Sequence, residues 1–244
     1  MGFSTVKVNV PDVQLVFKSG QTNYSDPANK RRNVELLQRI RTQYGLMINK
    51  WGDALSIPDG VIMGFIATES SGVMVGPNQF EATGLMQATP ASFYDSVSRW
   101  SSEVSDPIPA AVIKELTAKI PGLVKKPATA YSSIKPAILN LLKTDASFNI
   151  MAGCMVLRWM CERFSSGGVA LFNRAMVAYN AGAYTSSQLS TIPAERKKFF
   201  PNTSSSDTLA LVQSASVPRE SKYYLVKMLG VDGFLDLIYG QKLV

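Results

Sequence analysis

Most of the chain carries apolar residues at the spacing of an α-helix. From Ala28 onward they recur every three or four positions, which places them on one face of an amphipathic helix that we expect to run to about Trp51. The same period returns in later segments, between the proline, glycine and serine residues typical of helix ends and turns. The sequence therefore predicts a mainly α protein. Further helices are expected at about 56–72, 89–100, 108–119, 134–143, 145–164, 168–181, 218–229 and 232–239.

The first residues follow a different pattern. Residues 5–17 alternate between apolar and polar side chains, and this alternation predicts an extended strand. Because one strand needs a partner, this segment is either a peptide packed along the domain or a docking arm for a larger assembly. We therefore divide the chain into an extended N-terminal arm, residues 1–29, and one helical domain, residues 30–244. Within the domain, residues 101–143 are rich in Pro, Ser and Lys and are expected to form an insertion or lobe beside the rest.

Composition narrows the possible functions only a little. The 244 residues are 46% hydrophobic, which is enough for one well-buried domain, and the net charge is +7. A basic surface suits an anionic partner such as nucleic acid, a membrane surface or the bacterial cell wall. The basic residues are scattered, so we expect solvated faces rather than nucleic-acid recognition. No stretch has the pattern of a signal peptide or a membrane span, and we expect a soluble protein.

The residue types that are missing or rare limit the chemistry. The chain has no histidine, which excludes Ser-His and Cys-His nucleophilic sites and any histidine-ligated metal. Cys154 and Cys161 lie two helical turns apart, roughly 10 Å, which is too far for a disulfide. Both are expected to be core residues, and we expect neither a metal nor a cofactor. The remaining chemistry must use carboxylates, hydroxyls, amides, lysines or thiols.

A glutamate near the end of one predicted helix is the first candidate. In the helix expected at 56–72, Ser56 could cap the N-terminus, with Asp59 three residues later, and Gly72 could end it. Glu69 shares the apolar stripe of this helix. Burial raises the pKa of a carboxyl, and a protonated carboxyl can donate a proton to a glycosidic oxygen. The alternative is a helix-end glutamate that turns to solvent or pairs with a cation.

Several motifs accompany this glutamate in a fixed order, although each alone could be a helix cap, core filler or an exposed helix. They are Glu69-Ser70; Gly84-Leu85-Met86-Gln87, fifteen residues after the glutamate; Asn149-Ile150-Met151-Ala152-Gly153; Ala178-Tyr179-Asn180-Ala181-Gly182; and Glu220-Ser221-Lys222-Tyr223-Tyr224-Leu225. In this order and spacing, the chain resembles the lytic transglycosylase family of the goose-type lysozyme superfamily. The resemblance covers about residues 50–230.

The resemblance implies a lysozyme-like helical fold and a set of site residues. Glu69 would be the sole catalytic acid/base, and Glu220 would be a supporting carboxylate. The chain departs from the family at two points. Asn78 stands where the family often has a serine near the acetamido group of the substrate, and the gap from Gln87 to Asp145 is longer than usual, so the cleft rim is expected to be elaborated. The substrate-binding residues that the resemblance implies are Ser70, Asn78, Met86, Gln87, Tyr179, Asn180 and Glu220.

The reaction that the resemblance implies is cleavage of the β-1,4 bond between MurNAc and GlcNAc in peptidoglycan, with formation of 1,6-anhydroMurNAc. Ordinary glycosidases use two carboxylates; with Glu69 alone, the acetamido group of the substrate would have to stabilise the reacting carbon. The nearest alternative is a goose-type muramidase that hydrolyses the same bond with water. More distant alternatives are a binding or structural component without activity, and a nucleic-acid-binding protein.

A transglycosylase-like domain with an extended arm and no signal peptide is typical of a bacteriophage virion or lysis enzyme. We expect it to degrade the cell wall during phage entry or release, in the virion or in the host cytoplasm or periplasm. A bacterial origin with export by another route is the alternative. The expected partners are peptidoglycan glycan strands and, through the arm at 1–29, other virion proteins; we expect no nucleic acid and no membrane span.

Overall fold

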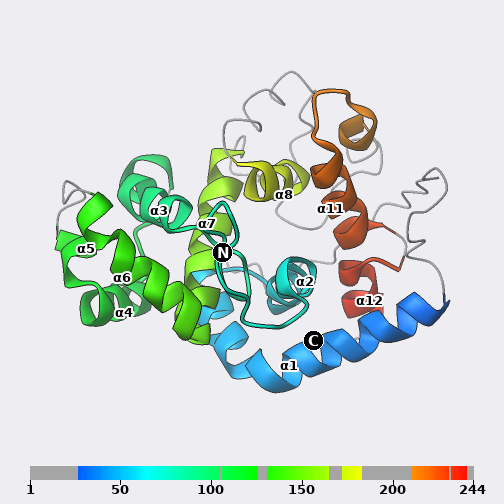
Figure 1. Ribbon diagram of the computed structural model, residues 1–244, viewed down its shortest axis with the longest axis horizontal. Coiled ribbons are helices and arrows are strands. Elements are labelled where there is room, and N and C mark those ends of the chain that lie inside the picture. Colours follow the sequence, from blue (N-terminus) through cyan, green and yellow to red (C-terminus); the bar gives the residue numbers. More distant parts are fainter. Residues whose placement is uncertain are drawn as a thin grey trace.

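The computed structural model describes residues 27–104, 106–125, 131–164, 172–182, 210–230 and 232–240. This part of the chain is mainly helical (Figure 1), which confirms the predicted α class. The strand expected at residues 5–17 lies outside the described residues. The helices are α1 (Pro27–Leu55), α2 (Asp59–Ser70), α3 (Pro90–Glu103), α4 (Ala110–Lys119), α5 (Pro121–Lys125), α6 (Tyr131–Thr144), α7 (Ala146–Arg163), α8 (Phe172–Ala181), α11 (Arg219–Leu229) and α12 (Phe234–Gly240).

Helix α7 forms the centre of the core. Every residue from Phe148 to Cys161 is buried, and the helix packs against α1, α3, α6 and α8, between the other helices in Figure 1. Its start is fixed by Asp145, whose side chain accepts a hydrogen bond from the backbone N–H of Phe148 at 2.9 Å. Cys154 and Cys161 are buried and free, as expected for core residues.

The predicted start of the second helix was wrong by three residues. Helix α2 begins at Asp59, and no side chain caps it. Ser56 instead has a left-handed backbone, with φ of 54°, because α1 runs further than expected, to Leu55, and Ser56 ends that helix. The other end is close to the prediction: Ser71 and Gly72 both have left-handed backbones, and the Ser71 N–H donates to the Ile66 carbonyl.

Helix α2 is buried all round rather than along one stripe. Residues 60–67 are all buried, and the helix packs against α1, α11 and α12. Glu69 and Thr68 are the first residues near its C-terminal end to regain partial exposure. The fold therefore brings the candidate glutamate out of the core at the last turn of a helix that is otherwise enclosed.

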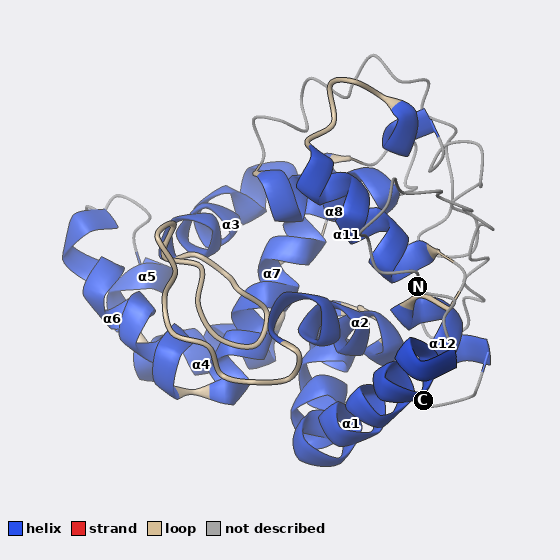
Figure 2. Cartoon of the chain, turned by 45° about the vertical axis from the view of Figure 1, so that its right-hand side comes forward, coloured by secondary structure: helices blue, strands red, loops and turns tan. Residues whose placement is uncertain are grey.

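Helices α4, α5 and α6 gather on one side of the molecule, next to α3 (Figure 1). They correspond to the insertion or lobe expected at 101–143, and α3 joins them to the core through its contacts with α6 and α7. Helix α3 begins at the expected Thr89-Pro90, where Thr89 and Ser92 form a reciprocal capping box. The α2–α3 connection, tan in Figure 2, reaches from α2 across to this lobe. Within the described residues, no helix is long and apolar enough to cross a bilayer.

Candidate active site

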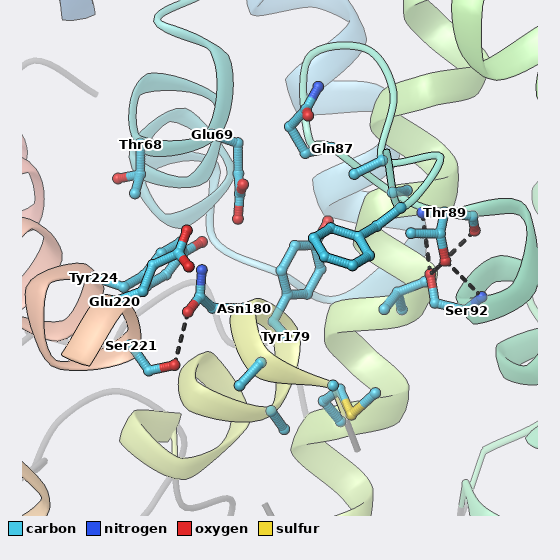
Figure 3. A pocket seen from close by; sticks show the side chains of 18 of the residues that line it. Thr68, Glu69, Gln87, Thr89, Ser92, Tyr179, Asn180, Glu220, Ser221 and Tyr224 are labelled. Carbon is cyan, nitrogen blue, oxygen red and sulfur yellow. Dashed lines mark hydrogen bonds between the residues drawn. The ribbon is translucent and has the colours of Figure 1, made fainter. Parts of the chain in front are cut away.

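A cleft of about 1600 Å³ opens beside the C-terminal end of α2. Pockets for small ligands are usually about 300–1,000 Å³, so this one has room for a larger or extended ligand. In Figure 3, Glu69 projects between Tyr224 and Glu220 on one side and Thr89 and Ser92 on the other. The walls come from α2, α3, α7, α8, α11 and the α2–α3 connection. Segments far apart in the sequence thus converge around one carboxyl group.

The Glu69 carboxyl has an altered proton affinity. Burial raises its pKa to about 7, and the negative charge of Glu220 raises it as well; the Tyr224 hydroxyl and the Lys227 ammonium lower it, but less than burial raises it. Glu69 also lies in the last turn of α2, where the helix dipole is negative and disfavours a carboxylate. At neutral pH the side chain can therefore hold a proton or release one, which is the property of a general acid/base.

Three side chains of α11 set the electrostatics around Glu69. Lys227 does not form an ion pair with the carboxyl; its ammonium donates instead to the Thr68 carbonyl at 3.2 Å, and burial lowers its pKa. The buried Tyr224 hydroxyl has no partner in hydrogen-bonding geometry among the described residues, although it lies close enough to act on the pKa of Glu69. Because residues four and seven positions apart share a helix face, Glu220, Tyr224 and Lys227 all reach the cleft.

Tyr179, from the last turn of α8, joins the cleft to the core. Its hydroxyl donates to the Met86 carbonyl at 2.7 Å, and its ring meets the Phe65 ring edge to face, with centroids 4.9 Å apart. Burial raises its pKa well above the usual range. The tyrosine therefore stays neutral and serves as a cleft wall whose hydroxyl proton is already engaged.

Asn180 follows Tyr179 and is held by α11. The Ser221 hydroxyl donates to its amide oxygen at 2.7 Å, which leaves the amide nitrogen turned toward the Glu69 side of the cleft (Figure 3). A fixed amide donor next to an acid/base can hydrogen-bond a carbonyl oxygen of a ligand, such as an acetamido oxygen. The fixed orientation is what links the two motifs at 178–182 and 220–225.

The turn at 84–87 is pinned by a fully buried asparagine from α7. The Asn149 side chain accepts from the Met86 N–H at 2.9 Å and donates to the Thr83 and Leu142 carbonyls at 2.8 and 2.9 Å. Gly84 has φ of 79°, and a Cβ there would collide with the Asn149 amide. Only glycine fits both demands. Two motifs that are 65 positions apart in the sequence thus hold each other.

Gln87 is the last residue of this turn, and it lies at the cleft. Its backbone is left-handed, with φ of 48°, and its amide donates to the Gly84 carbonyl at 2.9 Å. Such a backbone is strained for a residue other than glycine and persists only when its surroundings impose it. The side chain lines the cleft opposite Tyr224 and Glu220.

Asn78 lies on the rim of the cleft, but its oxygen is used by its own loop. The amide oxygen accepts from the backbone N–H groups of Phe80, at 2.8 Å, and Ala82, at 3.1 Å. The expectation that Asn78 contacts a substrate acetamido group therefore applies at most to its amide nitrogen. The side chain first of all shapes the loop 78–82.

Two of the expected substrate-binding side chains do not reach the cleft, and that part of the prediction needs correction. The Ser70 hydroxyl donates back to the Ile66 carbonyl at 3.1 Å and is buried. The Met86 side chain is fully buried because Gly153 leaves the space that its thioether fills; its backbone carbonyl accepts the hydrogen bond from Tyr179. In contrast, Glu69, Asn78, Gln87, Tyr179, Asn180 and Glu220 all line the cleft.

Several cleft residues were missed. Tyr224 and Lys227 could have been found from their helical spacing after Glu220, which puts all three on one face of α11. Asp95 of α3 and Phe80 of the rim also line the cleft, and no sequence signal distinguished them, because their position depends on how the α2–α3 connection folds over the lobe.

Within the described residues, no cluster of three or more acidic or thiol side chains could hold a metal ion. Comparison of the chain with protein-family models finds no matching model, and comparison with curated protein sequences finds no match either.

Proposed function

We propose that this protein is a peptidoglycan lytic transglycosylase, in which Glu69 serves as both general acid and general base. The observation that carries the proposal is the Glu69 carboxyl: it projects into a large cleft, and its pKa of about 7 lets it change protonation state at neutral pH. The order of motifs around it, which resembles that of the lytic transglycosylase family, supports the choice of substrate.

In the first step, protonated Glu69 donates its proton to the oxygen that joins MurNAc to GlcNAc. As this bond breaks, positive charge develops at C1 of MurNAc, and the acetamido oxygen of the same sugar stabilises it. The Asn180 amide nitrogen, whose orientation Ser221 fixes, is placed to position that acetamido group. The GlcNAc side leaves with the proton that Glu69 supplied.

In the second step, Glu69 is ionised and takes the proton from the C6 hydroxyl of MurNAc. That oxygen attacks C1 and closes the 1,6-anhydro ring, which restores protonated Glu69. The Lys227 ammonium and the Tyr224 hydroxyl, which lower the pKa of Glu69, favour the carboxylate between the two steps. Glu220, which raises that pKa, favours the proton-loaded form that begins the cycle.

The test is product analysis with purified peptidoglycan. The parent protein should release muropeptides with anhydro ends, and Glu69→Gln should release them about a thousandfold more slowly while keeping the parent circular dichroism spectrum. Reducing ends in place of anhydro ends would assign the site to a hydrolase that uses water. Parent-level release by Glu69→Gln would remove the acid/base role altogether.

The setting proposed for this activity is the opening of the bacterial wall by a phage, at entry or at release. The net charge of +7 supports it, because a positive surface is attracted to anionic wall polymers. Binding of Glu69→Gln to purified cell walls should weaken as the salt concentration rises. Binding that does not respond to salt would argue against this role of the charge.

A further inference from the structure

One large apolar side chain on the rim of the cleft is exposed to solvent. Phe80 has 72% of its surface exposed and lines the cleft. The other large exposed apolar residues among those described, Leu46, Val73, Val75 and Ile113, do not line it. A single exposed apolar residue is ordinary on a protein surface, but Phe80 also lines a cleft, and aromatic side chains are typical of the lining of clefts that bind ligands.

The loop that carries Phe80 is built to hold it there. The Asn78 amide oxygen accepts the N–H groups of Phe80 and Ala82, and the Glu81 N–H donates to the Asn78 carbonyl at 2.9 Å. Glu81 has a left-handed backbone, with φ of 63°, and its carboxylate pairs with Lys135 of α6 at 2.6 Å. The exposure of the ring is therefore imposed by the backbone and anchored to the lobe.

The cleft that Phe80 lines has the composition of a sugar-binding surface. The negative face of an aromatic ring attracts the positive edges of C–H bonds, and the flat face of a β-linked pyranose presents several C–H groups together. Gln79 and Asp95 also line the cleft and supply amide and carboxylate groups for hydroxyls. Binding sites commonly combine an apolar contact with a few such polar groups.

We propose that Phe80 is a stacking platform for one pyranose ring of the glycan strand, away from the bond that is cleaved, and that Asn78 is a positioning residue that holds this platform. The proposal rests on the proposed function, since it places a sugar polymer in the cleft. It gives the lobe a role: through Lys135 and Glu81, helix α6 fixes the rim against which the strand lies.

The platform is tested by binding to the inactive Glu69→Gln protein, with a β-1,4-linked GlcNAc hexamer as the probe and isothermal titration calorimetry as the readout. Adding Phe80→Ala should weaken binding about tenfold, the size expected for losing an aromatic contact, whereas Phe80→Trp should bind at least as well as Phe80. The matched control is Leu46→Ala, an exposed apolar residue on α1, which should bind like the parent.

The outcomes separate the two proposals. Hexamer binding that is equal for Phe80 and Phe80→Ala overturns the platform and leaves the proposed function standing. If the Glu69→Gln protein binds no hexamer at all, and the parent releases no muropeptides, both proposals fall. Loss of binding in Leu46→Ala as well would show that the effect is not specific to the cleft rim, which also overturns the platform.

The role of Asn78 is tested by two substitutions that separate the role of its amide oxygen from that of its amide nitrogen. Asn78→Asp keeps an oxygen that can accept both loop N–H groups but removes the amide donor, whereas Asn78→Ala removes both. A positioning role predicts parent-like hexamer binding for Asn78→Asp and weaker binding for Asn78→Ala. In the Phe80→Ala protein, adding Asn78→Ala should weaken hexamer binding little further, because the two changes act through one contact.

Weak binding by Asn78→Asp, equal to that of Asn78→Ala, would instead assign the amide nitrogen to the ligand and overturn the positioning role. Additive effects of Asn78→Ala and Phe80→Ala would overturn it as well. Circular dichroism of each variant should match the parent, since both side chains are exposed and contribute nothing to the buried core.

Discussion

Two carboxylates at helix ends, Asp145 and Glu69, show how one fold gives the same chemical group opposite properties. Both are partly buried, and both have a lysine nearby. Burial raises the pKa of each, but for Asp145 the hydrogen bonds from Lys119 and the Phe148 N–H outweigh it, so the pKa falls below its ordinary value. For Glu69 burial prevails, and the pKa rises to about 7.

The difference comes from the direct hydrogen bond of Lys119 to Asp145 and from which end of a helix each carboxylate occupies. Asp145 lies at the N-terminus of α7, where unpaired N–H groups and the positive end of the helix dipole favour a charge. Glu69 lies at the C-terminal end of α2, where neither is present, and Lys227 bonds to the Thr68 carbonyl instead. The Asp145 carboxylate therefore stabilises the start of a helix, whereas the Glu69 carboxyl holds a proton that it can donate near neutral pH.

The largest expected effect separates the two sites by activity. Glu69→Gln should reduce muropeptide release by about a thousandfold, within the range that a positioned acid/base contributes, while Asp145→Asn should keep parent activity. The measurement is the initial rate of release from purified peptidoglycan. A comparable loss in Asp145→Asn would mean that the two carboxylates do not differ in the way proposed.

The second effect concerns stability and its dependence on pH. The native pKa of Glu69, about 7, lies above its unfolded value of 4.5, so the native state binds the proton more tightly. Stability is therefore lost as pH rises from about 4.5 to 7. Glu69→Gln should be more stable than the parent by about 2 kcal/mol at pH 8, after allowance for its partial exposure, and equal to it at pH 4. Urea unfolding at both pH values is the measurement.

A smaller effect, of opposite sign, is expected at Asp145. Asp145→Ala should destabilise the protein by about 1 kcal/mol through loss of the helix cap. Because the pKa of Asp145 is lowered in the native state, the parent loses this contribution as pH falls through the native pKa. Asp145→Asn keeps a capping side chain but removes the charge. Comparing the free energies of unfolding of the two variants, measured with urea, therefore separates the contribution of the cap from that of the ion pair with Lys119.

The smallest effects are shifts of the pH profile by the charges around Glu69. Lys227→Met removes a charge that lowers the pKa of Glu69, and Glu220→Gln removes one that raises it. Because the first step needs protonated Glu69, activity should fall as pH rises through this pKa. That alkaline limb should move to higher pH in Lys227→Met and to lower pH in Glu220→Gln; shifts in the same direction would contradict the electrostatic account.

The sequence predicted the helices well where local signals agree. The Thr89-Pro90 start, the start of a helix near Asp145 and the break after Ala181 depend on residues that act on their own backbone. The start of α2 was missed because Ser56, a residue type that often caps a helix N-terminus, instead ends α1. Where α1 ends depends on how much of it packs against the core. Local chemistry cannot show which of two neighbouring helices will use a given residue.

The same division holds for the site. Glu69, Gln87, Tyr179, Asn180 and Glu220 could be placed at the cleft from their motifs alone. Met86 and Ser70 belong to the same motifs, yet their side chains are buried, because a motif records which residues a fold needs and not whether it needs them for packing or for a ligand. Phe80 and Asp95 also line the cleft, but only the folded structure shows this, because no local pattern in the sequence distinguishes them.

The hydrogen bonds to the backbone of Met86 have a consequence for local unfolding. The Asn149 side chain of α7 accepts from its N–H, and the Tyr179 hydroxyl of α8 donates to its carbonyl, so two helices hold a short turn on the wall of the cleft. Its amide hydrogen should exchange with deuterium only when the whole molecule unfolds, unlike those of other turns. This wall of the cleft would then persist for as long as the native state itself.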